Sequence, residues 1–240
     1  MAISVDTVYK TVLLILNKEQ RGYMTPDEFN KVGTQVQLEI FEKYFEDLNQ
    51  LTRVPQNDMD YADRVAYLDQ KISLFKKYGI SVTPTSNGVA TFPTNLHVLG
   101  TVTMNEIEVQ RVSRNEYYNL KKSPITKPTL SYPVYLLENN SIQLDPFLGE
   151  SNNTTQNVLF DYISKPASPE WNYSVGSVGQ FIFNAVNSPA NPSVDFGLHS
   201  SEQVELVLRI LAYAGIIIRD PNIVQAATSQ VQQTNINEKS

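Results

Sequence analysis

The chain has 240 residues, 41% of them hydrophobic and 18% charged, with a net charge of -6 and a pI of about 5.0. This length allows a substantial core, and we expect two intertwined lobes. The acidic balance argues against bulk nucleic-acid binding, which needs a clustered cationic face, and leaves only a transient contact with DNA. Because Cys is absent, disulfides, thiolate metal sites and Cys nucleophiles are excluded.

The N-terminal third is predicted to be helical. A first helix is expected from Val5 to Arg21 and a third from Asp58 to Tyr78, stopping at Gly79. The second helix has a complete start signal, with Thr25 as N-cap, Pro26 at the first helical position and Glu28 closing a capping box. The apolar run at residues 12–16 is too short for a membrane span and lacks a signal-peptide cleavage pattern, so we expect no membrane partner.

The second helix, Thr25 to Leu51, is apolar over more than half of its circumference. Its first stripe consists of Phe29, Val32, Val36, Ile40, Tyr44 and Leu51. Its second stripe consists of Leu38, Phe41, Phe45 and Leu48. Either the first and third helices cover both stripes within one subunit, or the second stripe contacts another subunit.

From Ser81 onward, turns and alternating residues predict a β-rich lobe. Two hairpins are expected, Val98–Met104 with Ile107–Val112 and Val134–Leu137 with Ser141–Leu144, together with a central strand at Val158–Ile163. A capping box at residues 113–116 predicts a short helix that ends before Pro124. Four prolines between Ser164 and Pro192 predict an extended segment around a possible strand at Gly179–Ala185.

The chain is expected to return to helix at Ser200, with an interruption at Gly215 and a last short helix from Asp220 to Ala227. These elements predict an α+β fold in which N-terminal and C-terminal helices pack with an antiparallel β-sandwich or barrel-like lobe. The expected divisions are a helical module at 1–80, the β-rich lobe with its Pro-rich segment at 81–198, C-terminal helices at 199–228 and a flexible tail at 229–240.

Catalytic chemistry has no recognisable signature in the chain. His97 and His199 have no metal-ligating neighbours at suitable spacing, so no metal site is expected. There is no Gly-x-Ser-x-Gly elbow and no Gly-rich phosphate loop. We therefore expect no catalytic residue, no cofactor and no enzymatic activity.

Basic residues are concentrated in one segment, from Arg111 to Lys127. It contains Arg111, Arg114, Lys121, Lys122 and Lys127, with Tyr117 and Tyr118 between them. The segment is either a solvated helix face or a docking patch for an acidic neighbour, such as another copy of this acidic chain.

Several stretches resemble structural proteins of tailed bacteriophages. They are NKEQRGYMTPDEFN, QVQLEIFEKYFEDLN, VSRNEYYNL, PVYLLENNSIQLDP, VLFDYISKPASPEWNY and HSSEQVELVLRILAYAGIIIRDPNIVQAA. The likeness covers most of residues 1–228 and is strongest to neck and ring components of crAss-like podoviruses that infect gut Bacteroidetes. The order of elements is similar to that of head-to-tail adaptor proteins, which combine a helical module with a β-sandwich or barrel and stack as twelve-fold rings beneath the portal.

This resemblance implies a virion protein at the head-to-tail junction, made in the host cytoplasm. Its partners would be further copies in a ring, the portal and neighbouring tail proteins, with DNA only passing through. Candidate subunit-interface residues are Leu38, Phe41, Phe45, Leu48, Arg114, Lys121, Lys122 and Trp171. The alternative function is a tail-associated glycan-binding module that uses the aromatic residues Tyr117, Tyr118, Tyr132, Tyr135, Trp171 and Tyr173.

Overall fold

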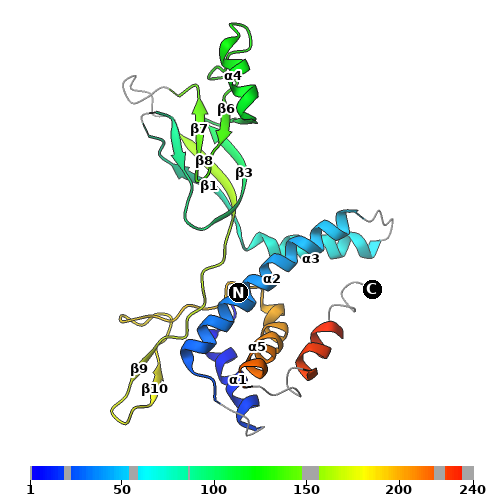
Figure 1. The fold of residues 1–240 in the computed structure, drawn as a ribbon, viewed down its shortest axis with the longest axis vertical. Coiled ribbons are helices and arrows are strands. Elements are labelled where there is room, and N and C mark those ends of the chain that lie inside the picture. The colour runs from blue at the N-terminus through cyan, green and yellow to red at the C-terminus, as the bar shows by residue number, and fades with distance from the viewer. Residues whose placement is uncertain are drawn as a thin grey trace. The chain divides into compact units, whose positions relative to one another are not determined.

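The computed structural model describes residues 2–18, 23–53, 59–85, 87–147, 157–218 and 225–233. The chain forms two units, a helical unit made of Met1–Leu74 with Pro166–Ser240 and a β unit made of Phe75–Lys165 (Figure 1). Helices combined with antiparallel and mixed sheets confirm the predicted α+β fold.

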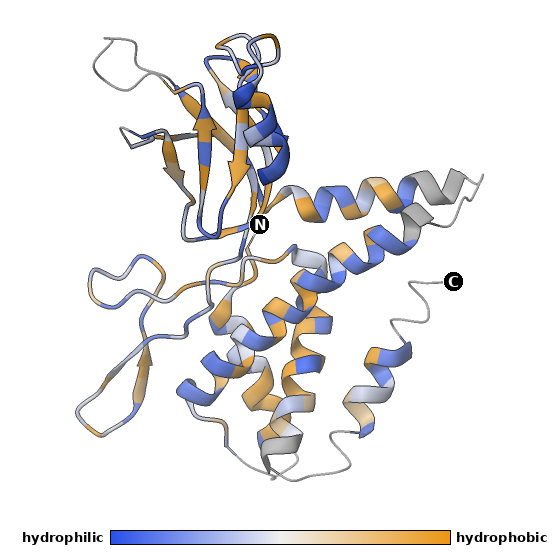
Figure 2. Ribbon diagram, turned by 45° about the horizontal axis from the view of Figure 1, so that its top comes forward, coloured by the Kyte–Doolittle hydropathy of each residue, from blue (hydrophilic) through white to orange (hydrophobic). Residues whose placement is uncertain are grey.

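The helical unit is built around a long central helix. Its elements are α1 (Val5–Lys18), α2 (Pro26–Arg53), α3 (Met59–Ser73), strands β9 (Tyr173–Val175) and β10 (Phe181–Phe183), the 3-10 turn η2 (Ser200–Glu202) and α5 (Gln203–Ile218). Figure 2 shows that α5 is hydrophobic along most of its length, as expected for a helix packed among others. Helix α5 passes through Gly215 without the predicted interruption, and residues 225–233 are also helical.

The start of α2 has the predicted capping box. Glu28 N donates to Thr25 Oγ1 at 3.4 Å, and Thr25 N donates to Glu28 Oε2 at 2.8 Å. Two backbone donors that no helical carbonyl can reach are thereby satisfied. The hydrogen bond from Thr25 also holds the pKa of Glu28 below its usual range.

Residues 166–198, which include most of the predicted Pro-rich segment, belong to the helical unit, whereas we predicted them in the β-rich lobe at 81–198. Gln37 of α2 accepts from Gly197 N at 2.9 Å and donates to Ala167 O at 2.7 Å. Near the N-terminus, Ile3 and Phe196 form an antiparallel β-bridge. Long-range hydrogen bonds of this kind have no local signature in the sequence, which is why the boundary was misplaced.

The β unit consists of two four-stranded sheets that share one core. The first sheet has the order β1-β8-β3-β4 and the second the order β2-β7-β6-β5. The strands are β1 (Lys76–Val82), β2 (Val89–Thr91), β3 (Leu96–Met104), β4 (Ile107–Glu108), β5 (Gln110–Val112), β6 (Val134–Leu137), β7 (Ser141–Asp145) and β8 (Val158–Ser164). Buried residues of both sheets, such as Phe160 and Ile142, form one cluster, so the lobe is sandwich-like, without closure into a barrel among the described strands.

The predicted hairpins are present, with one change of partner. Strands β3 and β4 are joined by Asn105 and Glu106, which both have positive φ, and β6 pairs with β7. Residues 110–112 leave this first hairpin and pair in parallel with β6 of the other sheet. Strand β8 lies between β1 and β3, as its apolar sequence predicted.

The end of the third helix was predicted wrongly. Helix α3 ends at Ser73, and Tyr78 lies in β1, which pairs with β8. The apolar spacing of Ile72 and Phe75 fits a helix, but tertiary pairing with β8 determines the structure from Lys76 onward. The predicted starts of the third and last helices, at Asp58 and Asp220, lie outside the described residues, as do Gly22 and most of the predicted tail.

The capping box of α2 makes a stability prediction. Thr25→Ala should lower the free energy of unfolding by about 1 kcal/mol, because the N–H of Glu28 loses its acceptor. Urea unfolding followed by circular dichroism measures this change. Thr25→Ser keeps the hydroxyl and should retain most of the stability; an equal loss in both variants would show that the cap does not contribute.

Candidate interaction surfaces

The second stripe of α2 is largely covered by its own chain. Phe41 is only 1% exposed and contacts Phe45 with ring centroids 5.0 Å apart. Leu38, Phe45 and Leu48 are half-buried. Phe41 is therefore a core residue of the helical unit, which favours coverage of the second stripe within one subunit. A contact of Leu38, Phe45 and Leu48 with a second subunit stays a prediction.

Ion pairs join α2 and α3 to the segment of η2 and α5. Glu205 of α5 accepts from Arg209 at 2.6 Å and from Lys43 of α2 at 3.2 Å, and Lys71 of α3 lies 2.5 Å from Glu202. Burial opposes ionisation of the Glu205 carboxyl, but Lys43 and Arg209 together outweigh it and hold its pKa below the usual range. These buried pairs need each partner in place, so this flank of α2 is a structural contact within the chain.

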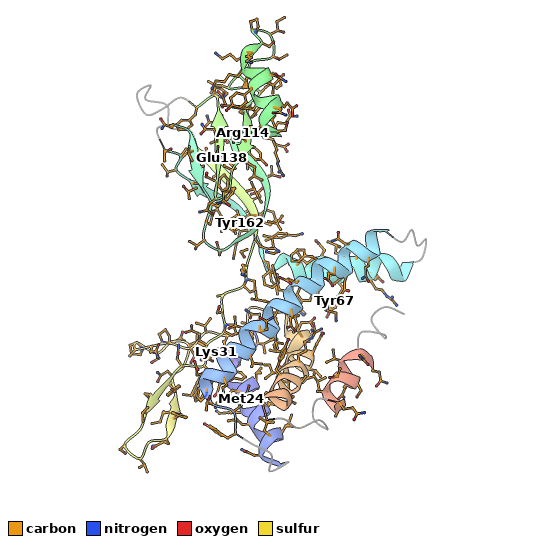
Figure 3. All side chains as sticks on the ribbon, in the orientation of Figure 1. Met24, Lys31, Tyr67, Arg114, Glu138 and Tyr162 are labelled. Atoms are coloured by element: carbon orange, nitrogen blue, oxygen red, sulfur yellow. The ribbon has the colours of Figure 1, made fainter. Side chains whose placement is uncertain are left out.

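The basic segment forms an exposed surface of the β unit, which we name the cationic tip. It comprises Arg111, helix α4 (Arg114–Lys122) and the loop that follows to Tyr132. Ser113 caps α4 with the predicted capping box, and Figure 3 shows Arg114 at the start of this helix. The exposed side chains of Tyr118, Ile125 and Tyr132 lie on the same surface.

Most cations of the tip have no internal partner. Lys121 lies 3.4 Å from Asp145 and donates to the Tyr117 hydroxyl at 3.3 Å, and these contacts raise its pKa. Arg111, Arg114, Lys122 and Lys127 form no ion pair with any residue that the structure describes. In the helical unit, by contrast, Lys10, Lys31, Lys43, Lys71 and Arg209 each pair with a carboxylate. Four exposed cations are thus available to an external acidic group.

A shallow pocket of about 410 Å³ lies beside the start of α4. It is lined by Arg111, Val112, Ser113, Arg114, Leu136 and Leu137. The aliphatic side chains provide apolar walls, and the two guanidinium groups provide hydrogen-bond donors. Such a lining can accept an apolar side chain together with backbone carbonyl groups.

A second exposed surface is the β9–β10 hairpin, residues 173–183, which extends away from α1 and α2 (Figure 1). We name it the uncharged hairpin, because the chain carries no charged residue from Trp171 to Val194. Val175, Val178, Phe181 and Ile182 are all exposed on it. Exposed strands in soluble proteins are usually protected by charged side chains, so this hairpin has the character of a surface that another protein covers.

Trp171 anchors this hairpin to the helices. Its ring lies 4.7 Å from Tyr9 and 5.6 Å from Phe183 between centroids, and its Nε1 donates to Asp6 at 3.1 Å. The side chain is 5% exposed, so the predicted interface residue is a core residue of its own chain. Trp171 can therefore affect an interface formed by the hairpin only indirectly, by fixing the position of the hairpin's base.

The aromatic residues proposed to bind glycans do not form one platform. Tyr117, Tyr135 and Trp171 are buried, and burial raises the pKa of Tyr117 and Tyr135. Tyr118 and Tyr132 are exposed on the cationic tip, whereas Tyr173 is half-buried in the helical unit. No observation on the described residues favours a sugar site.

Sequence reasoning missed the exposed residues of the uncharged hairpin. The available signal was the absence of charge over residues 171–194 combined with Gly176 and Gly179 at a turn.

The chain's charges are unevenly divided between the units. Residues 75–165 carry eight Lys and Arg and seven Asp and Glu, so the β unit has a net charge of +1 and the helical unit -7.

Comparisons with known proteins give no assignment: neither the protein-family models nor the curated proteins include a match to this chain. Within the described ranges, no cluster of three or more His, Cys, Asp or Glu could hold a metal ion. No helix in the part of the chain that the structure describes is long and apolar enough to cross a membrane.

The Glu205 ion pairs predict a specific pH dependence. The folded-state pKa is lowered, so the stabilisation is complete above the ordinary glutamate pKa of about 4.3 and is lost as the pH falls through the lower folded-state value. Glu205→Gln should reduce the free energy of unfolding near neutral pH and make it decline less steeply in acid. Urea unfolding across the acidic range measures this, with the exposed Glu46→Gln as control; a parallel decline in Glu205→Gln and the wild type would contradict the role of the carboxylate.

The free cations of the tip predict a salt-dependent association. Reversal of Lys121 and Lys122 to Glu should weaken contact between copies more at low salt than at high salt, because salt screens exposed charges. Lys122→Glu is the sharper variant, since Lys121 already forms an ion pair with Asp145 of its own chain. Sedimentation velocity at two salt concentrations measures the effect, with Lys77→Glu in β1 as a matched control. An effect independent of salt, or an equal effect of Lys77→Glu, would dismiss the electrostatic contact.

Proposed function

We propose that this protein is a non-enzymatic virion component, a subunit of the connector ring between the portal and the tail of a tailed bacteriophage. The ring would form part of the channel through which DNA leaves the head. The proposal rests on the resemblance of most of residues 1–228 to neck and ring proteins.

The observation that carries the proposal furthest is the presence of two different exposed surfaces on one chain. A closed ring needs a heterologous contact, in which each copy offers one surface to the copy before it and another to the copy after it. The uncharged hairpin belongs to the helical unit and the cationic tip to the β unit. The hairpin carries no charge and the tip is cationic, so the chain offers the two different patches that a heterologous contact requires.

The charge distribution also supports the proposal. DNA passing through a channel would be held by clustered cations, because each phosphate contact releases counterions and strengthens binding. The net charge of -7 on the helical unit disfavours such retention. The four unpaired cations of the tip lie on the β unit and could bind an acidic protein surface instead.

Mass spectrometry of purified virions tests this function. The protein should be present in the particle at a copy number consistent with a ring, and electron microscopy of the neck should locate it between portal and tail. A particle that lacks the protein, or contains it only in the capsid shell, would refute the role. Binding to a glycan array together with absence from the neck would support the sugar-binding alternative.

A further inference from the structure

The uncharged hairpin continues a buried aromatic cluster into solvent. Exposure rises outward along it, from 5% at Trp171 to 42% at Phe181, 65% at Val175 and 87% at Val178. Val175 pairs with Phe181 and Tyr173 with Phe183, so these four side chains lie on one face of the hairpin. The inner end of that face is covered by Trp171, and the outer end is open to solvent.

The turn at the end of the hairpin is held by its own hydrogen bonds. Gly176 N donates to Gln180 O and Gly179 N to Gly176 O, both at 2.9 Å. Val178 N donates to the side-chain Oε1 of Gln180 at 3.2 Å. Gly179 has a φ of +82°, in the left-handed region that favours glycine. The turn therefore presents Val178 in a defined conformation, which lowers the entropic cost of docking it.

We propose that the uncharged hairpin of one copy docks into the pocket beside α4 of a second copy, with Val178 as the anchoring side chain. Val112, Leu136 and Leu137 would contact the valine. Arg111 and Arg114 would donate hydrogen bonds to carbonyl groups of the turn that its internal bonds leave free.

A second copy is the occupant that the charges favour. Copies of an acidic chain repel one another, and the repulsion is strongest between helical units of net charge -7. The hairpin itself carries no charge, and the pocket lies on the unit with a net positive charge. One chain thus carries both halves of a heterologous contact.

The inference deepens the proposed function, because it names the contact between copies of the ring. The two can fail separately. A protein present in the virion neck whose Val178 makes no contact would overturn the docking alone. A protein absent from the virion that still associates through Val178 would overturn the connector role alone.

The sign of a charge placed at position 178 tests the pocket. Val178→Lys should weaken association of the full-length chain at least tenfold, because a lysine would lose the apolar contact and face two arginines. Val178→Asp should weaken it less, since its carboxylate would be attracted to the same arginines. Val204→Lys, at a valine of the same unit that is 70% exposed, serves as the matched control and should associate like the wild type.

Sedimentation equilibrium over a concentration series measures these dissociation constants, and circular dichroism confirms that each variant is folded. Equal association of Val178→Lys and the wild type would overturn the proposal, as would a wild-type protein that stays monomeric at its highest soluble concentration. A stronger loss in Val178→Asp than in Val178→Lys would exclude the arginine-lined pocket.

The absence of native Cys permits a direct test of the contact. Val178→Cys labelled with a benzophenone maleimide is mixed with an isotopically labelled unmodified copy and irradiated. Mass spectrometry should find the cross-link on residues 111–114 or 136–137 of the labelled copy. A cross-link confined to the modified copy would overturn the intermolecular contact, and one elsewhere on the labelled copy would overturn the pocket.

Discussion

Two amide side chains of α2 hold the extended segment 166–198 against the helices, and the exposed surface of the helical unit depends on them. Asn30 accepts from Trp171 N at 2.7 Å, and Gln37 bonds Ala167 O and Gly197 N. An irregular segment that packs on a helix must satisfy its backbone groups without a sheet, and an amide can supply a donor and an acceptor at once. Because these bonds lie before and after the β9–β10 hairpin in the chain, they fix its base while its outer end stays exposed.

The charged side chains also differ in role between the inside of the helical unit and the exposed surfaces. Charged side chains inside the helical unit are used for internal packing, as in the pairs of Glu205 with Lys43 and Arg209. The exposed surfaces that can bind another protein are instead the uncharged hairpin and the cationic tip, where four of the five cations form no ion pair with a described residue. Two surfaces of such different character suit the two sides of a ring contact better than a symmetric dimer, in which one patch must bind itself.

Local signals in the sequence predicted local structure well. The capping boxes at Thr25 and Ser113, the β3–β4 and β6–β7 hairpins and the central strand β8 all depend on residues close together in the chain. The wrong predictions depend on contacts between residues that are far apart in the chain. The end of α3 and the placement of residues 166–198 depend on β8 and on Gln37, which are distant in sequence. Phe41 and Trp171 were predicted at an interface because apolar and aromatic residues suit a core and an interface equally.

The sequence by itself determined the α+β class and the positions of most helices and strands, because propensity, capping and alternation act over a few residues. It also determined the concentration of cations between residues 111 and 127, because that is a matter of composition alone. Only the tertiary structure decided which apolar residues are enclosed and which are exposed. Phe41 and Val178 are both apolar, yet one is 1% exposed and the other 87%, since exposure depends on what distant segments lie against each side chain. The pocket beside α4 likewise depends on segments that are distant in sequence. Its lining comes from residues 111–114 and 136–137, which lie side by side only because residues 110–112 pair with residues 134–136.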